Sequence, residues 1–78
     1  MLARQRTTAP VSMRALIARI NRKLKDEGEV LKAARSERVA SSVGLFFIVR
    51  GNRIASERVD PEALARKLGV LSAWEHLE

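Results

Sequence analysis

Hydrophobic residues recur at helical spacing in the first third of the chain. Five of them fall at positions i, i+3, i+4, i+7 and i+11, on one side of an α-helix: Met13, Leu16, Ile17, Ile20 and Leu24. Ser12 precedes this stripe as a favourable N-cap, and Gly28 follows it where a helix can end in a left-handed conformation. The pattern predicts an amphipathic helix over residues 12–27. Residues 1–11 lack periodicity and include Pro10, so we expect them to form a disordered basic leader.

The middle of the chain carries the pattern of β-strands. Residues 44–50 (GLFFIVR) are rich in the aromatic and β-branched side chains that favour a strand. Gly51 and Asn52 form a two-residue connection suited to a type II′ hairpin turn, after which residues 53–59 return as a less apolar strand near a sheet edge. Residues 29–35 fit either a short strand, which we favour, or a continuation of the first helix. The polar residues 36–42 are predicted to form a loop.

A second helix is predicted to begin at Asp60. Asp60 is a suitable cap, Pro61 fits the first helical position, and Glu62 lies at the positive end of the helix dipole. Gly69 is expected to end this helix. Three apolar residues follow as a tail that we expect to pack back on the body of the protein: Val70, Leu71 and Trp74.

The order of these elements predicts an α+β fold. We expect a small α-β-β-β-α domain over residues 12–76, with a three-stranded antiparallel sheet and two helices packed on one face. The last two residues, Leu77 and Glu78, match the dipeptide that a cloning site leaves before an affinity tag, so we treat 77–78 as a tail that need not be native.

The central strand is apolar on both of its faces. Because alternate residues of a strand point to opposite sides, Phe46 and Ile48 share one face, and Leu45, Phe47 and Val49 share the other. Two helices can cover only one side of so small a sheet. The second apolar face therefore predicts an interface through Leu45, Phe47 and Val49, either with a second copy of the chain or with an unknown protein partner.

Charge is concentrated at the N-terminal end. The net charge is +6, and residues 1–25 hold seven basic residues and no acidic ones, whereas residues 26–78 hold eight basic and nine acidic residues. On the predicted helix the cations lie away from the apolar stripe, and we predict that they contact nucleic-acid backbone: Arg14, Arg19, Arg22, Lys23 and Lys25. The alternative is that the charge serves only solubility and reflects an arginine- and alanine-rich composition.

Residues for catalysis or metal binding are sparse. The chain has no cysteine and a single histidine, His76, which lies beside the acidic Glu75 near the C-terminus. Two adjacent residues do not make a metal site, and no serine lies in a recognisable nucleophile motif. Glycine-rich phosphate loops are missing as well. We therefore predict no catalytic residues, no metal, no cofactor and no small-molecule substrate.

Two short stretches resemble parts of nucleic-acid-binding families. Residues 63–70 (ALARKLGV) resemble the first helix and turn of a helix-turn-helix, but Ser72–His76 would then have to supply the recognition helix, which is too short and lacks a basic residue. Residues 44–49 (GLFFIV) resemble the aromatic strand of an RNA-recognition motif, whose βαββαβ order does not match the order predicted here. Phe46 and Phe47 are therefore expected in a core or an interface.

These observations predict a small non-enzymatic binding or accessory protein. The favoured function is contact with nucleic-acid backbone through the basic helix, and the alternative is a protein-interaction module or homodimer without a nucleic-acid role. The residues leave open whether DNA or RNA is bound. The absence of cysteine fits a reducing compartment, and no apolar run approaches the roughly 20 residues that span a bilayer, so we expect a cytoplasmic protein without membrane contact.

Overall fold

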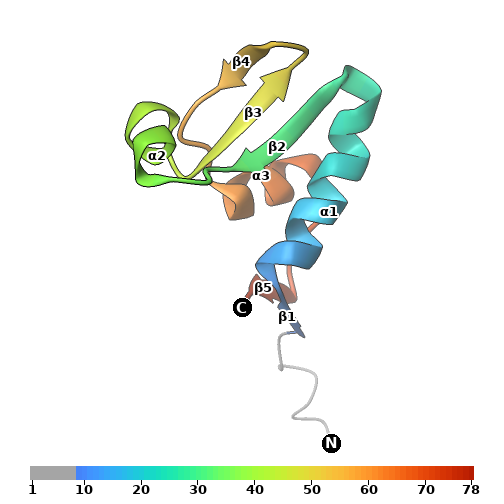
Figure 1. The fold of residues 1–78 in the computed structure, drawn as a ribbon. Helices are drawn as coiled ribbons and strands as arrows, with labels where there is room; N and C mark the ends of the chain where they lie inside the picture. The colour runs from blue at the N-terminus through green and yellow to red at the C-terminus, as the bar shows by residue number, and fades with distance from the viewer. Residues whose placement is uncertain (1–8) are drawn as a thin grey trace, which may run out of the picture.

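The structure, a computed structural model, describes residues 9–78 and consists of a small sheet with helices on one face and at one end (Figure 1). The elements are, in chain order, β1 (Ala9–Val11), α1 (Met13–Leu24), the 3-10 helix η2 (Lys25–Glu27), β2 (Glu29–Ala33), α2 (Glu37–Val43), β3 (Phe46–Arg50), β4 (Arg53–Ser56), α3 (Pro61–Leu68) and β5 (Glu75–Leu77). The predicted α+β class with a three-stranded antiparallel sheet is confirmed.

The antiparallel sheet has the strand order β2-β3-β4. Leu31 of β2 lies opposite Ile48 of β3, and Val30 lies opposite Val49, which in turn lies opposite Ile54 of β4. The register shifts between Ile48 and Val49 because β4 holds one extra residue there. Residues 29–35 were predicted to form either a strand or a continuation of the first helix. The structure shows a strand over residues 29–33.

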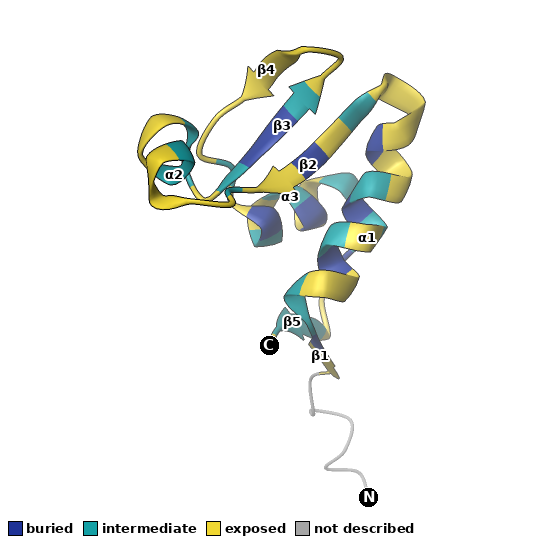
Figure 2. Cartoon of the chain, in the orientation of Figure 1, coloured by how far each residue is buried: buried dark blue, intermediate teal, exposed yellow. Residues whose placement is uncertain are grey.

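The core lies between the inner face of this sheet and the helices α1 and α3. Leu16 and Ile20 of α1 are completely buried, as is Ala65 of α3, and they form one cluster with Leu31 and Ile48 of the sheet. The buried side of α1 faces the sheet and α3, while its other side is exposed (Figure 2). The helical stripe predicted from the sequence is therefore the side that forms the core.

Both main helices begin at the predicted caps. The Ser12 hydroxyl accepts the Ala15 N–H at 3.1 Å, and the Asp60 carboxylate accepts the Glu62 N–H at 3.0 Å. Such caps satisfy backbone donors that have no partner within the helix, typically at a gain of about 1 kcal/mol each. The caps fix where α1 and α3 start, and thereby which of their residues face the sheet.

The two ends of the described chain pair with each other. Strands β1 and β5 form a separate parallel pair, in which Val11 lies opposite Leu77 and the Glu78 N–H donates to the Val11 carbonyl at 2.8 Å. The predicted disordered leader is wrong for residues 9–11, since Val11 is buried in the core; residues 1–8 lie outside the described residues. Leu77, placed in the predicted tail, also packs on the core.

The predicted loop at residues 36–42 is wrong, because the segment contains helix α2. The Ser36 hydroxyl caps this helix by accepting the Val39 N–H at 3.3 Å, and Gly44 ends it. Serine is a favourable N-cap, which explains why a polar stretch starts a helix here. Helix α2 lies at the end of the sheet where β3 begins (Figure 1).

Strand β4 ends earlier than predicted because the backbone turns sharply at Arg58. Arg58 has a φ of 49°, and its N–H donates to the Val43 carbonyl at 2.8 Å. A Cβ atom at Gly44 would lie 2.7 Å from the Arg58 Cα atom, so only glycine allows the two backbones to approach this closely. The contact closes the end of α2 against the segment that follows β4.

Candidate functional site

The predicted basic residues of α1 divide into two groups in the structure. Arg14, Arg22, Lys23 and Lys25 are exposed, and none has a carboxylate within ion-pair distance among the described residues. Arg19 is half-buried and is bonded to the C-terminal segment. Within residues 9–78, the five residues are therefore four unpaired cations and one cation, Arg19, that has a carboxylate partner.

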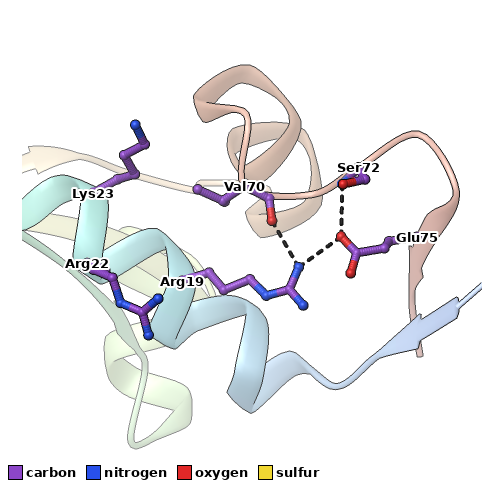
Figure 3. Close-up of a pocket in the computed structure, with 6 residues that line it drawn as sticks. All are labelled: Arg19, Arg22, Lys23, Val70, Ser72 and Glu75. Carbon is purple, nitrogen blue, oxygen red and sulfur yellow. Dashed lines mark hydrogen bonds and ion pairs between the residues drawn. The ribbon is translucent and has the colours of Figure 1, made fainter.

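Arg19 crosses from α1 to the C-terminal segment (Figure 3). Its Nη1 atom donates to the Val70 carbonyl at 3.0 Å and to Glu75 Oε1 at 2.9 Å. The same Glu75 oxygen accepts the Ser72 N–H at 2.9 Å. Hydrogen bonds from Arg19 and from the Ser72 backbone lower the pKa of Glu75, and the hydrogen bond to Glu75 raises the pKa of Arg19. Both groups are held in their charged forms.

A second arginine holds the same segment from α3. Arg66 donates to the Ser72 carbonyl at 3.2 Å and to the Glu75 carbonyl at 3.1 Å, and it also pairs with Glu62 at 3.2 Å, one helical turn earlier. The Glu75 N–H closes the turn by donating to the Ser72 carbonyl at 3.0 Å. Residues 72–75 are thus a turn whose backbone is bonded at both ends to helices of the core.

A hollow lies between α1 and this turn. Its lining comes from three cationic residues of α1 and three residues of the C-terminal segment: Arg19, Arg22, Lys23, Val70, Ser72 and Glu75 (Figure 3). Because Arg19 compensates the Glu75 carboxylate, the remaining charge on the lining is that of Arg22 and Lys23. The hollow is therefore positively charged and suits an anionic group.

The unpaired cations of the described chain are most numerous on and directly after α1. Of the thirteen lysines and arginines in residues 9–78, nine have no ion-pair partner among the described residues, and four of these nine lie on α1 or in η2 directly after it. Five of the nine acidic residues are already in ion pairs. Ion pairing within the described chain thus leaves the water side of α1 strongly positive.

The three residues of the predicted apolar interface do not share one hollow. Leu45 is 69% exposed and lines a hollow with Glu37, Ala40 and Ser41 of α2. Phe47 is only 9% exposed and lies with Val49 in a different hollow on the outer face of the sheet. Leu45 precedes β3, and residues of α2 line both hollows, with Glu37, Ala40 and Ser41 beside Leu45 and Val39 beside Phe47 and Val49.

Sequence reasoning missed the exposed apolar residues of the outer face. Val30 is 43% exposed and Ile54 is 45% exposed, and they lie on either side of Val49 across the three strands. Only the register of the sheet brings them together, and that register depends on the irregularity after Ile48. The alternation of residues within one strand does not show which residues of neighbouring strands lie side by side. It therefore could not have predicted the row of Val30, Val49 and Ile54.

Trp74 does not pack on the body of the protein as predicted. It is 65% exposed, whereas Leu71 of the same predicted tail is 5% exposed and belongs to the core. Residues Ser72–His76, which a helix-turn-helix would need as a recognition helix, form a turn followed by the start of β5. The structure therefore does not support the helix-turn-helix resemblance.

Metal ligands do not gather in residues 9–78, where no group of three or more histidine, cysteine, aspartate or glutamate side chains lies close enough to hold an ion. The His76 Nδ1 atom is shielded from solvent without a hydrogen-bond partner among these residues. The same part of the chain contains no helix with the length and apolar character needed to cross a bilayer. The predicted lack of enzymatic activity stays a prediction.

Comparisons with known proteins provide no functional information. No protein-family model matches the chain, and no curated protein or solved structure shows significant similarity to it. A function must therefore be inferred from the residues and geometry of this chain alone.

Proposed function

We propose that the protein is a non-enzymatic nucleic-acid-binding protein that contacts the sugar–phosphate backbone through the basic side of α1. The observation that carries this proposal is a set of four exposed cations, on and directly after this helix, that have no ion-pair partner in residues 9–78: Arg14, Arg22, Lys23 and Lys25. Cations that neutralise phosphates release condensed counterions, which drives binding. The proposal agrees with the cytoplasmic location expected for the cysteine-free chain.

The helix presents these cations from a fixed scaffold. Arg14 and Arg22 are separated by eight residues, or about 12 Å along the helix at 1.5 Å per residue. Phosphates recur about every 3.4 Å along each strand of a duplex, so the helix can reach several of them. Phosphate contacts carry no sequence information by themselves, so we expect binding that depends weakly on sequence and strongly on salt.

The alternative function is a protein-interaction module on the outer face of the sheet. The row of Val30, Val49 and Ile54 supports it, because two of these side chains are more than 40% exposed. The hollow beside this row is also lined by the cations Lys32 and Arg35. A second copy would bring like charges together there, so an acidic partner fits this face better than a homodimer does.

Fluorescence anisotropy with labelled random-sequence duplex DNA and single-stranded RNA tests the proposal, across a salt series from about 50 to 200 mM. We expect affinity to fall steeply with salt. Arg14→Glu/Arg22→Glu should reduce affinity at least about tenfold and reduce the salt slope by about two, one for each lost phosphate contact.

A matched control separates a local surface from net charge. Arg53→Glu/Lys67→Glu changes the net charge by the same four units, but its residues lie on β4 and α3. The proposal requires this control to bind much more tightly than the α1 variant. Equal losses in both variants, or no binding by tens of micromolar protein at low salt, would overturn it.

A further inference from the structure

Trp74 is an exposed aromatic residue in the turn that borders the basic hollow. It is the only tryptophan of the chain and is 65% exposed. Ser72 and Glu75, on either side of it in sequence, both line the hollow. A large exposed aromatic side chain thus belongs to a turn of which two other residues line a hollow with the cations of α1.

The backbone that carries Trp74 is held at several points. The Trp74 carbonyl accepts the Ala9 N–H at 2.8 Å, the Ser72 and Glu75 carbonyls accept hydrogen bonds from Arg66, and Glu75 is bonded to Arg19. Trp74 is therefore exposed on a turn whose backbone is held in place on both sides of this residue. Fixed presentation reduces the ordering that a ligand contact would otherwise require.

We propose, on the basis of the proposed function, that the nucleic acid bound is single-stranded and that one of its unpaired bases stacks on Trp74 while neighbouring phosphates contact Arg22 and Lys23. Proteins that bind single strands combine a positively charged path for the backbone with aromatic side chains that stack on bases. The bases of a duplex are already stacked on each other and cannot use Trp74 in this way. Duplex binding would involve the cations alone.

An anionic membrane surface also attracts cations and tryptophan, but the surroundings of Trp74 fit it less well. Interfacial binding requires a continuous apolar face. The neighbours of Trp74 in the turn are the small Ala73 and the polar Ser72 and Glu75, and the nearby Leu71 is buried in the core. A single aromatic side chain among polar groups suits one base better than a lipid layer.

Intrinsic fluorescence tests the inference directly, because all tryptophan emission comes from Trp74. The wild-type protein is titrated with a single-stranded oligonucleotide of roughly 16 nucleotides, the span of a large single-strand site, and with a hairpin duplex of equal nucleotide content. Vesicles of phosphatidylcholine and phosphatidylglycerol form a third arm. We expect saturable quenching by the single strand, little change with the duplex, and no blue shift with vesicles.

Substitution of Trp74 distinguishes the contribution of base stacking to the binding affinity from that of the cations. Trp74→Ala should weaken single-strand binding by about 5- to 150-fold, the range found when one stacking side chain is removed, and should leave duplex binding unchanged. Trp74→Phe keeps a ring and should retain part of the affinity. Because Trp74 is exposed, circular dichroism of each variant should match that of the wild type.

The outcomes distinguish this inference from the proposed function. If Trp74→Ala binds single strands as tightly as the wild type while Arg14→Glu/Arg22→Glu does not, the stacking inference is overturned and the basic surface stands. If the protein binds no nucleic acid at low salt, both proposals fail. A blue shift of Trp74 emission on vesicles, without quenching by single strands, would overturn the inference in favour of a membrane surface.

Discussion

The basic side of α1 and the outer face of the sheet are both exposed, but they differ in what surrounds them. The cations of α1 stand beside a turn that Arg19 and Arg66 bond to the core. The outer sheet face presents Val30 and Ile54, which are about half exposed and lie on the two outer strands. Polar contacts with defined geometry thus frame the first region, and partly exposed apolar side chains form the second.

The edges of the sheet explain why the outer face need not lead to self-association. Asn21 closes one edge, since its Oδ1 accepts the Leu31 N–H at 2.7 Å and its Nδ2 donates to the Leu31 carbonyl at 3.3 Å. The other edge, β4, is short, contains the register shift and begins with Arg53. Short, irregular and charged edges are features by which proteins avoid strand pairing between copies. The comparison indicates that exposed apolar residues alone are weak evidence for a homodimer.

The largest effect is a loss of stability expected on substitution of Phe47. The sequence analysis had placed Phe47 in the same interface as Leu45. Phe47→Ala should destabilise the protein by about 3 kcal/mol or more, because a mostly buried ring is lost, and much of the chain should be unfolded at 37 °C. Leu45→Ala should cost under about 0.5 kcal/mol, as expected for a surface residue. Urea unfolding measures both. Similar costs for the two variants would show that they share one environment, against the structure.

A comparison of substitutions in the two regions should locate the nucleic-acid-binding surface. Arg14→Glu/Arg22→Glu should lower the affinity at least about tenfold. Val30→Lys/Ile54→Lys adds two cations to the outer face and should raise the affinity at most about twofold through long-range attraction. Anisotropy at a single low salt concentration is sufficient for this measurement. A large gain for the lysine variant would place the contacting surface on the sheet.

An intermediate effect is expected from Asn21, which links α1 to β2. Asn21→Ala leaves the buried Leu31 N–H without its partner and should destabilise the protein by about 1–3 kcal/mol. Asn21→Asp retains the acceptor and should lose less of the thermal stability.

The Asn21→Ala variant also tests whether an unprotected β2 edge leads to self-association. Size-exclusion chromatography over a range of protein concentrations shows whether the variant forms dimers. A dimeric wild type would contradict the view that both edges are protected.

The main helices were predictable from the sequence because their signals are local. The apolar stripe identified Leu16 and Ile20, and Ser12 and Asp60 cap the helices as predicted. Strands β1 and β5 were not predictable, since each has three residues and exists only by pairing with the other end of the chain. The same limit applies to the site: the cations of α1 are evident in the sequence, but nothing local links Arg19 to a carboxylate 56 residues away.

The smallest effects are expected on removal of the ion pair between Arg19 and Glu75. Stability should fall, whereas affinity for nucleic acid should rise. Glu75→Gln removes the carboxylate that holds Arg19, so the variant should unfold at lower urea concentration than the wild type at pH 7. The same change frees the Arg19 guanidinium to face the hollow, so affinity for nucleic acid should rise, about two- to fivefold for one added phosphate contact. Glu57→Gln removes an exposed carboxylate that pairs only with its neighbour Arg58, and it should alter neither property measurably.

The stability difference should also depend on pH in a defined direction. The native structure lowers the pKa of Glu75 below its ordinary value of 4.5, so the ion pair stabilises the folded state fully above about pH 4.5 and loses this effect as the pH falls through the lower native value. The urea midpoints of the wild type and Glu75→Gln should therefore differ at pH 7, and the difference should shrink as the pH falls below about 4.5. A difference that stays constant over this range would mean that Glu75 acts through packing, and that Arg19 is not held by its charge.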